Sequence, residues 1–75
     1  PNPTDDKLRV TIKPELEVKE LYFIDFNGKR IKPQSINRTK EKLEIDVSNI
    51  KIGIHILEII AEEEINKVKV IIKRW

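Results

Sequence analysis

Hydrophobic and polar residues alternate along much of this chain. A two-residue period is typical of β-strands with one buried face. The first such stretch spans residues 7 to 13, where Leu8, Val10 and Ile12 alternate with charged residues and threonine. Pro14 follows, and proline cannot donate a hydrogen bond to a neighbouring strand. The pattern therefore predicts a strand that ends before Pro14.

A second extended stretch runs from Leu16 to Phe26. We expect one side of it to carry Val18, Leu21 and Phe23, and the other to carry Tyr22 and Ile24. It closes in Asp25-Phe26-Asn27-Gly28, and Asn-Gly is the strongest short hairpin signal because both residues tolerate positive φ. Residues 30 to 32 are then predicted to form a short return strand before Pro33.

The middle of the chain changes character twice. Residues 34 to 41 are polar apart from Ile36 and show no period, which indicates a loop or a poorly paired edge strand. Alternation resumes at Leu43, Ile45 and Val47. After Gly53 comes a run from Ile54 to Ile60 that is rich in β-branched residues, so we expect a strand buried on both faces.

The end of the chain predicts one more hairpin. Residues 61 to 64, Ala-Glu-Glu-Glu, are expected to form a charged turn, and a last strand should cover Ile65 to Ile72. No window of a dozen residues fits a helix better than a strand. Several short strands with turn signals between them favour an all-β fold, an antiparallel β-sandwich. Its core is expected to include Phe23 and Phe26.

Composition limits what such a domain does. With 75 residues the chain forms one small domain, and its lack of Met, even at position 1, suggests that it was cut from a longer protein. Without Cys and with one His it offers no disulfide, thiolate metal site or zinc site, and we expect no cofactor. Fifteen basic and 13 acidic residues leave a net charge of +2, too little to indicate nucleic-acid binding. No apolar run approaches the length of a membrane span, and no secretory leader opens the chain.

Candidate chemistry is sparse. Asp46, Ser48 and His55 are the residue types of a hydrolase triad, but no G-x-S-x-G turn presents the serine. We expect Ser48 to cap a turn and His55 to pack within a strand. The acidic run 62–64, with Asp5, Asp6 and Asp25, matches no calcium loop and is expected to be a solvated hairpin tip. We therefore predict that the domain is not an enzyme.

The order of short motifs is more informative. The chain opens with Pro1-Asn2-Pro3-Thr4, which leads into Asp6-Lys7-Leu8-Arg9-Val10. Next come Val18-x-x-Leu21-x-Phe23-x-Asp25-x-x-Gly28-Lys29 and Ile45-Asp46-Val47-Ser48-Asn49-Ile50. The series ends with Gly53-Ile54-His55-Ile56-Leu57-Glu58-Ile59 and Val70-Ile71-Ile72-Lys73-Arg74. Over essentially the whole chain this series resembles the type A C-terminal sorting domain of the type IX secretion system of Bacteroidota. Each motif alone is common, so the resemblance depends on their order and spacing.

This resemblance implies an immunoglobulin-like β-sandwich of about seven strands. It implies that residues 1–75 are the C-terminal tail of a longer secreted protein, with residues 1–6 as the lead-in from a linker. Such a cargo is exported to the periplasm by a separate signal peptide and recognised by outer-membrane machinery that includes a shuttle protein. A sortase then removes the tail, at or just before Pro1, while the cargo is attached to the cell surface.

The resemblance also assigns the residues of the secretion signal: Pro1, Asn2, Pro3, Asp25, Gly28, Gly53, His55, Ile71, Ile72, Lys73 and Arg74. Gly28 should supply the positive φ of the hairpin, with the Asp25 carboxylate bonded back to turn amides. Gly53 should let the chain turn tightly into the longest strand. The last strand should present a basic-ended edge to the machinery. His55 stands where the family usually has Tyr, and Trp75 extends past the usual basic ending.

A second function stays open. An immunoglobulin-like accessory or carbohydrate-binding module of a larger enzyme would use an aromatic platform, and Tyr22 and Trp75 are the candidates. A designed sandwich without a ligand is a third possibility, which the irregular stretch 34–41 disfavours. The sequence does not predict the oligomeric state, or which surface the secretion machinery contacts.

Overall fold

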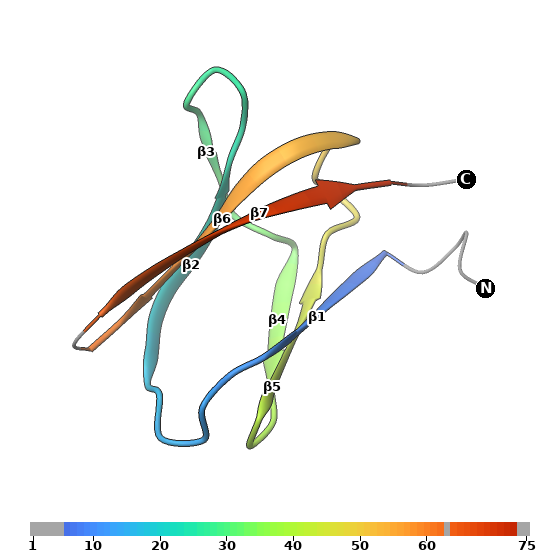
Figure 1. The fold of residues 1–75 in the computed structure, drawn as a ribbon. Helices are drawn as coiled ribbons and strands as arrows, with labels where there is room; N and C mark the ends of the chain where they lie inside the picture. The colour runs from blue at the N-terminus through green and yellow to red at the C-terminus, as the bar shows by residue number, and fades with distance from the viewer. Residues whose placement is uncertain (1–5, 63, 74–75) are drawn as a thin grey trace.

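Seven strands form two antiparallel sheets in a computed structural model that describes residues 6–62 and 64–73 (Figure 1). The strands are β1 (Lys7–Thr11), β2 (Val18–Ile24), β3 (Arg30–Ile31), β4 (Ser35–Arg38), β5 (Lys42–Asp46), β6 (Gly53–Ala61) and β7 (Ile65–Ile72). One sheet has the order β1-β5-β4, and the other has the order β3-β2-β6-β7. The described ranges contain no helix. The all-β prediction is confirmed.

The strand orders are those of an immunoglobulin-like sandwich. Strands B, E and D form one sheet of that fold, while C′, C, F and G form the other. Here β1-β5-β4 corresponds to B-E-D, and β3-β2-β6-β7 corresponds to C′-C-F-G. The described part of the chain has no strand equivalent to A. The number of strands and the architecture therefore match the expectation from sequence.

The core lies between the two sheets. The four-stranded sheet contributes side chains from β2, β6 and β7, and the three-stranded sheet contributes side chains from β5 and the turn that follows it. These core residues are Leu21, Phe23, Leu43, Ile45, Val47, Ile50, Leu57, Ile59 and Ile72. Full burial of one such side chain contributes about 1.5–3 kcal/mol. Alternation in β2, β5 and the β6–β7 hairpin is thus what supplies the core.

A β-bulge in β2 explains how Val18 joins the same side as Leu21. Residues three apart in a regular strand point to opposite faces. The register of β2 against β6 shifts between Val18 and Glu20, which inserts Lys19 as an extra residue. Val18 consequently packs against the core together with Leu21, as the sequence predicted.

Two expectations were wrong. Phe26 is 95% exposed rather than buried, because it is one of the turn residues at the tip of the β2–β3 hairpin. A hydrogen bond from the Gly28 N–H to the Asp25 carbonyl closes this turn. The run 54–60 is not buried on both faces. Leu57 and Ile59 are buried in the core, but the outward-facing Ile54 is 58% exposed, since the described residues provide no further layer over that face.

Residues 34–41 hold a real strand. β4 pairs with β5 through Ser35↔Asp46 to Arg38↔Leu43 and forms an edge of its sheet, so the edge alternative was correct and the loop alternative was wrong. The sequence shows no alternation here because all four residues of β4 are exposed. When neither face of a strand is buried, its sequence does not need to alternate hydrophobic and polar residues.

The two phenylalanines form a matched pair for testing the core. Phe23→Ala should cost about 3–5 kcal/mol in the free energy of unfolding, because the ring is fully buried. Phe26→Ala should change it by less than about 0.5 kcal/mol. Urea unfolding of both variants measures the difference, and equal destabilisation by the two would contradict this core.

Candidate functional site

The described residues of the expected secretion signal converge on one end of the four-stranded sheet. The β6–β7 register pairs Gly53 with Ile72 and His55 with Val70. On the other side of β6, Ile24 pairs with Ile56, so the turn that begins at Asp25 lies beside the start of β6. Motifs around residues 25–28, 53–55 and 71–73 are therefore neighbours in space. Pro1, Asn2, Pro3 and Arg74 lie outside the described residues, as does Trp75.

Asp25 organises the β2–β3 turn with its carboxylate. The Oδ1 atom accepts the N–H of Asn27 at 2.8 Å and that of Lys29 at 2.9 Å. The hydrogen bond from the Lys29 amide is the main cause that holds the pKa of Asp25 below its usual value, and the hydrogen bond from the Asn27 amide and the nearby positive charge of Lys29 act in the same direction. Gly28 has φ +83°, as the turn chemistry predicted. The turn is thus fixed by its own backbone amides.

Gly53 and His55 shape the start of β6. Gly53 has φ +139°, a conformation that side-chain-bearing residues rarely adopt, and an added Cβ would meet no atom within 4 Å. Backbone conformation, rather than crowding, therefore favours glycine here. His55 is buried, with its ring edge-to-face on Phe23 at 6.2 Å between ring centroids. Its Nδ1 lies 3.2 Å from the Gly53 carbonyl oxygen.

The end of β7 separates its side chains between core and surface. Ile72 is buried in the core, whereas Ile71 is 56% exposed and Lys73 is exposed. Ile71 stands directly opposite Ile54 on β6. Side chains that pair directly across antiparallel strands contact each other. Strand β7 therefore packs into the core through Ile72, while the neighbouring Ile71 faces solvent.

These exposed isoleucines belong to a larger apolar surface. The next pair inward on the same face is Ile24 and Ile56, and both are half-buried. We call Ile24, Ile54, Ile56 and Ile71 the isoleucine patch. The strand registers place Arg30 beside Ile24 and Lys69 beside Ile56, so cations flank the patch on two sides. Outer faces of sandwich strands normally carry polar residues, which makes this surface a candidate contact site.

Sequence reasoning missed Glu58, which is the unusual residue of this face. It points to the outer side of β6, yet its side chain is 7% exposed. Arg30 and Lys67 approach its carboxylate at 3.9 Å from either side, and Oε1 has no hydrogen-bond partner among the described residues. The Arg30 guanidinium also lies 5.0 Å from the centre of the Tyr22 ring. Around Glu58 the side chains of Arg30 and Lys67 are therefore exposed to solvent, whereas the Glu58 carboxylate is buried.

The residue types of a hydrolase triad do not assemble. The Asp46 carboxylate accepts the Ser48 N–H at 3.0 Å and pairs with Lys7 at 3.6 Å. Hydrogen bonds from Ser48 are the main reason that the pKa of Asp46 lies below its usual value. His55 instead lies in the other sheet against Phe23. Asp46, not Ser48, is thus the residue that caps this turn.

Acidic residues at the opposite end of the sandwich also have structural partners. Glu62, in the β6–β7 turn, pairs with Lys19 at 3.1 Å, and Glu17 binds the same ammonium group at 3.1 Å. Residues 6–62 and 64–73 contain no group of three His, Asp or Glu side chains placed to hold a metal ion. No membrane-spanning helix occurs within those ranges either.

Comparisons with known proteins identify the family. A family model described as the secretion system C-terminal sorting domain matches residues 1–73 of the 75-residue chain. A search of curated proteins and a search of solved structures each found no significant match. The match covers every described residue of the expected signal.

Acid titration tests the role of the Asp25 carboxylate. Its pKa is lowered in the folded chain, so its stabilising contribution is complete above the unfolded pKa of about 3.9 and is lost as the pH falls through the folded value. Asp25→Asn should therefore lower the urea midpoint at pH 7, and the difference from the parent chain should shrink steadily below pH 4 or so. A difference that stayed constant down to pH 2 would show that the charge of Asp25 has no part in the effect.

Proposed function

Because this chain belongs to the secretion system C-terminal sorting domain family, we propose that it is the non-catalytic tail that directs a larger protein through the type IX secretion system. Membership in the family implies export to the cell surface or the extracellular space. On this proposal residues 1–75 follow a linker, the cargo first passes through the periplasm, and a sortase removes the tail near Pro1. The domain is then the substrate of that cleavage and supplies no catalytic residue.

One observation carries the proposal: signal residues from three separate segments meet at one end of one sheet. Asp25 and Gly28 come from the β2–β3 turn, Gly53 and His55 from the start of β6, and residues 71–73 from the end of the chain. On this proposal the secretion machinery recognises a folded surface and not a linear sequence, because the three segments lie together only when β2, β6 and β7 are paired. Its accessible part is the isoleucine patch with Lys69 and Lys73.

The backbone of β7 supports recognition at the same place. The Ala61 N–H bonds to the Glu64 carbonyl, and in an antiparallel ladder such hydrogen-bonded pairs alternate with non-hydrogen-bonded pairs. The peptide groups of Ile65, Lys67, Lys69 and Ile71 consequently point away from β6, along an edge where no other described strand pairs with β7. We propose that the secretion machinery pairs with this edge and covers Ile71 and Ile54, since added strands gain affinity from main-chain hydrogen bonds and specificity from side chains.

A reporter fusion tests the export role. Residues 1–75 should carry a periplasm-directed reporter across the outer membrane of a host with a type IX secretion system, and deletion of residues 71–74 should leave it in the periplasm. Ile71→Glu should lower the rate of export by roughly tenfold or more, because a charge replaces an apolar contact at the proposed interface. Reporter activity in the medium or on the cell surface is the measurement.

Ile65→Glu is the matched control for this experiment. Ile65 lies on the same strand and faces the same side, and its exposure of 58% is close to that of Ile71, but it is at the opposite end of β7. Export of this variant should stay near the parental level. Equal loss in both variants would place recognition elsewhere on β7, and undiminished export after deletion of residues 71–74 would refute the proposed signal.

A further inference from the structure

Strand β4 leaves hydrogen-bonding groups of its backbone open on one side. The Thr39 N–H bonds to the Lys42 carbonyl, so the alternating pattern directs the peptide groups of Ser35 and Asn37 toward β5. The peptide groups of Ile36 and Arg38 then point away from β5. Among the described residues β5 is the one strand paired with β4. An extended segment is thus able to add to the sheet along this edge.

The inner face of β4 is also incompletely covered. Ile36 pairs with Ile45, which is fully buried in the core, yet Ile36 itself is 42% exposed. The difference arises because β5 has neighbours on both sides, whereas β4 is the last strand of its sheet. A strand added beside β4 would cover Ile36 and remove its apolar surface from water.

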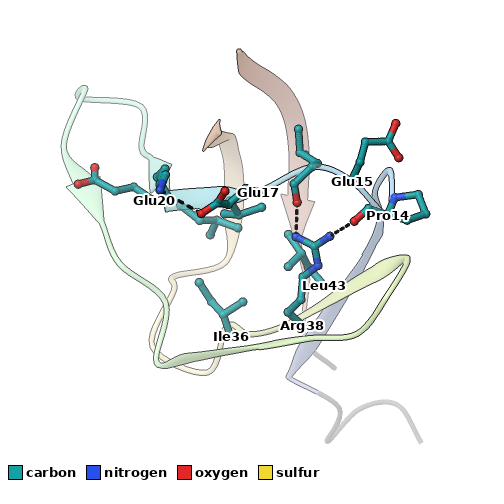
Figure 2. A pocket seen from close by; sticks show the side chains of 11 residues that line it. Pro14, Glu15, Glu17, Glu20, Ile36, Arg38 and Leu43 are labelled. Carbon is teal, nitrogen blue, oxygen red and sulfur yellow. Dashed lines mark hydrogen bonds and ion pairs between the residues drawn. The ribbon is translucent and has the colours of Figure 1, made fainter. Parts of the chain in front are cut away.

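A groove of about 480 Å³ runs beside Ile36, between β4 and the segment that leads into β2. Figure 2 shows Ile36 and Arg38 rising from β4 toward this segment, with Glu15, Glu17 and Glu20 along the opposite side. Its apolar lining comes from both sheets: Leu16, Val18, Leu21, Ile36 and Leu43. The groove therefore offers an apolar floor next to an open backbone edge.

Arg38 holds the two sides of the groove together. Its guanidinium donates to the carbonyl oxygens of Leu16 at 2.6 Å and Pro14 at 3.1 Å (Figure 2). Its Nε donates to the carbonyl oxygen of Thr39 at 3.0 Å. The positive charge is therefore engaged by backbone acceptors. These bonds tie β4 to the loop before β2, so the groove is a preformed feature of the fold.

The rim of the groove is acidic at the Arg38 end. Lys19 is paired with Glu17 and Glu62, whereas Glu15 and Glu20 have no ion pair within the described residues. A neighbouring hollow of about 390 Å³ continues past Glu15 and Glu17, and its lining adds Glu62, Glu64 and one cation, Lys13, so that carboxylates outnumber cations there. At the opposite end Lys32 lines an adjoining hollow of about 230 Å³ beside Glu20. The groove thus has one acidic end and one end of mixed charge.

We propose that this groove, defined by β4 and residues 14–21, binds an extended segment of a partner protein by strand addition to β4. The segment pairs with the peptide groups of Ile36 and Arg38, places an apolar side chain over Leu21 and Ile36, and carries a basic residue at the end near Glu15 and Glu17. Main-chain hydrogen bonds, an apolar pocket and opposite charge together define the kind of segment that the groove binds. The inference is independent of the proposed export signal, which lies at the end of β7.

Titration with synthetic peptides tests the proposal on the 75-residue chain. The probe is a short peptide of alternating lysine and valine, and the matched control has glutamate in place of lysine. Amide hydrogen exchange, followed by NMR, should slow by about tenfold at Ile36 and Arg38 with the lysine peptide, since each amide gains a hydrogen-bond acceptor. The β7 amides should not change. The glutamate peptide should have no such effect.

Two variants separate the contributions of the acidic rim and of the apolar lining to peptide binding, and a third is a control. Glu15→Gln should weaken binding of the lysine peptide, whereas Glu44→Gln, which removes a carboxylate paired with Arg9 on another strand, should not. Ile36→Thr should abolish the exchange protection while the chain stays folded. Equal protection by both peptides, protection confined to β7, or protection of Ile36 that rises with protein concentration alone would overturn the proposal, the last by showing that a second copy is the occupant.

Discussion

The pairing of β6 on both of its sides is the constraint on which the rest of the structure depends. β6 is the longest strand, and it pairs with β2 on one side and with β7 on the other. Its inward residues Leu57 and Ile59 form the middle of the core. A shift of either register by one residue would turn every side chain of the neighbouring strand to the opposite face. Core burial therefore fixes the register, and the register places Asp25, Gly53 and Ile71 together.

The small size of the domain explains why so much apolar surface stays exposed. Two sheets of three and four strands cover each other on one face only, and the described residues provide no third layer. β3 has two residues, so the side of the sandwich between β4 and β2 is open beside Ile36. The isoleucine patch lies on the uncovered face of the other sheet. Incomplete coverage costs stability, and it leaves exposed the two surfaces that are proposed to bind partners.

Charges on these surfaces are arranged differently. Around the isoleucine patch the acid Glu58 is buried between Arg30 and Lys67, so the cationic groups face solvent. Around the β4 groove Arg38 is occupied by carbonyl oxygens, and carboxylates remain on the rim. One surface therefore favours a partner with acidic groups and the other favours a basic one. This difference separates the proposed export contact from the proposed groove ligand.

Local patterns in the sequence predicted much of the fold. Alternation gave β1, β5 and β7, and Asn-Gly gave the β2–β3 turn with the positive φ at Gly28. Phe26 was misassigned because hydrophobicity does not reveal that a residue lies at the tip of a turn. Strand β4 lacked a period because neither of its faces is buried. The Glu58 environment and the groove depend on pairings between distant segments, which no local window contains.

A disulfide across β6 and β7 tests the register most directly. Ile54 and Ile71 form a non-hydrogen-bonded pair, and the Cα atoms of such pairs lie about 4.5 Å apart, within the range that a disulfide spans. The double variant Ile54→Cys with Ile71→Cys should close an intramolecular disulfide on mild oxidation and keep its fold. The variant Ile54→Cys with Val70→Cys should not, because Val70 faces the core side. Efficient closure of the second pair but not the first would show a shifted register, and the proposed signal residues would then not share one surface.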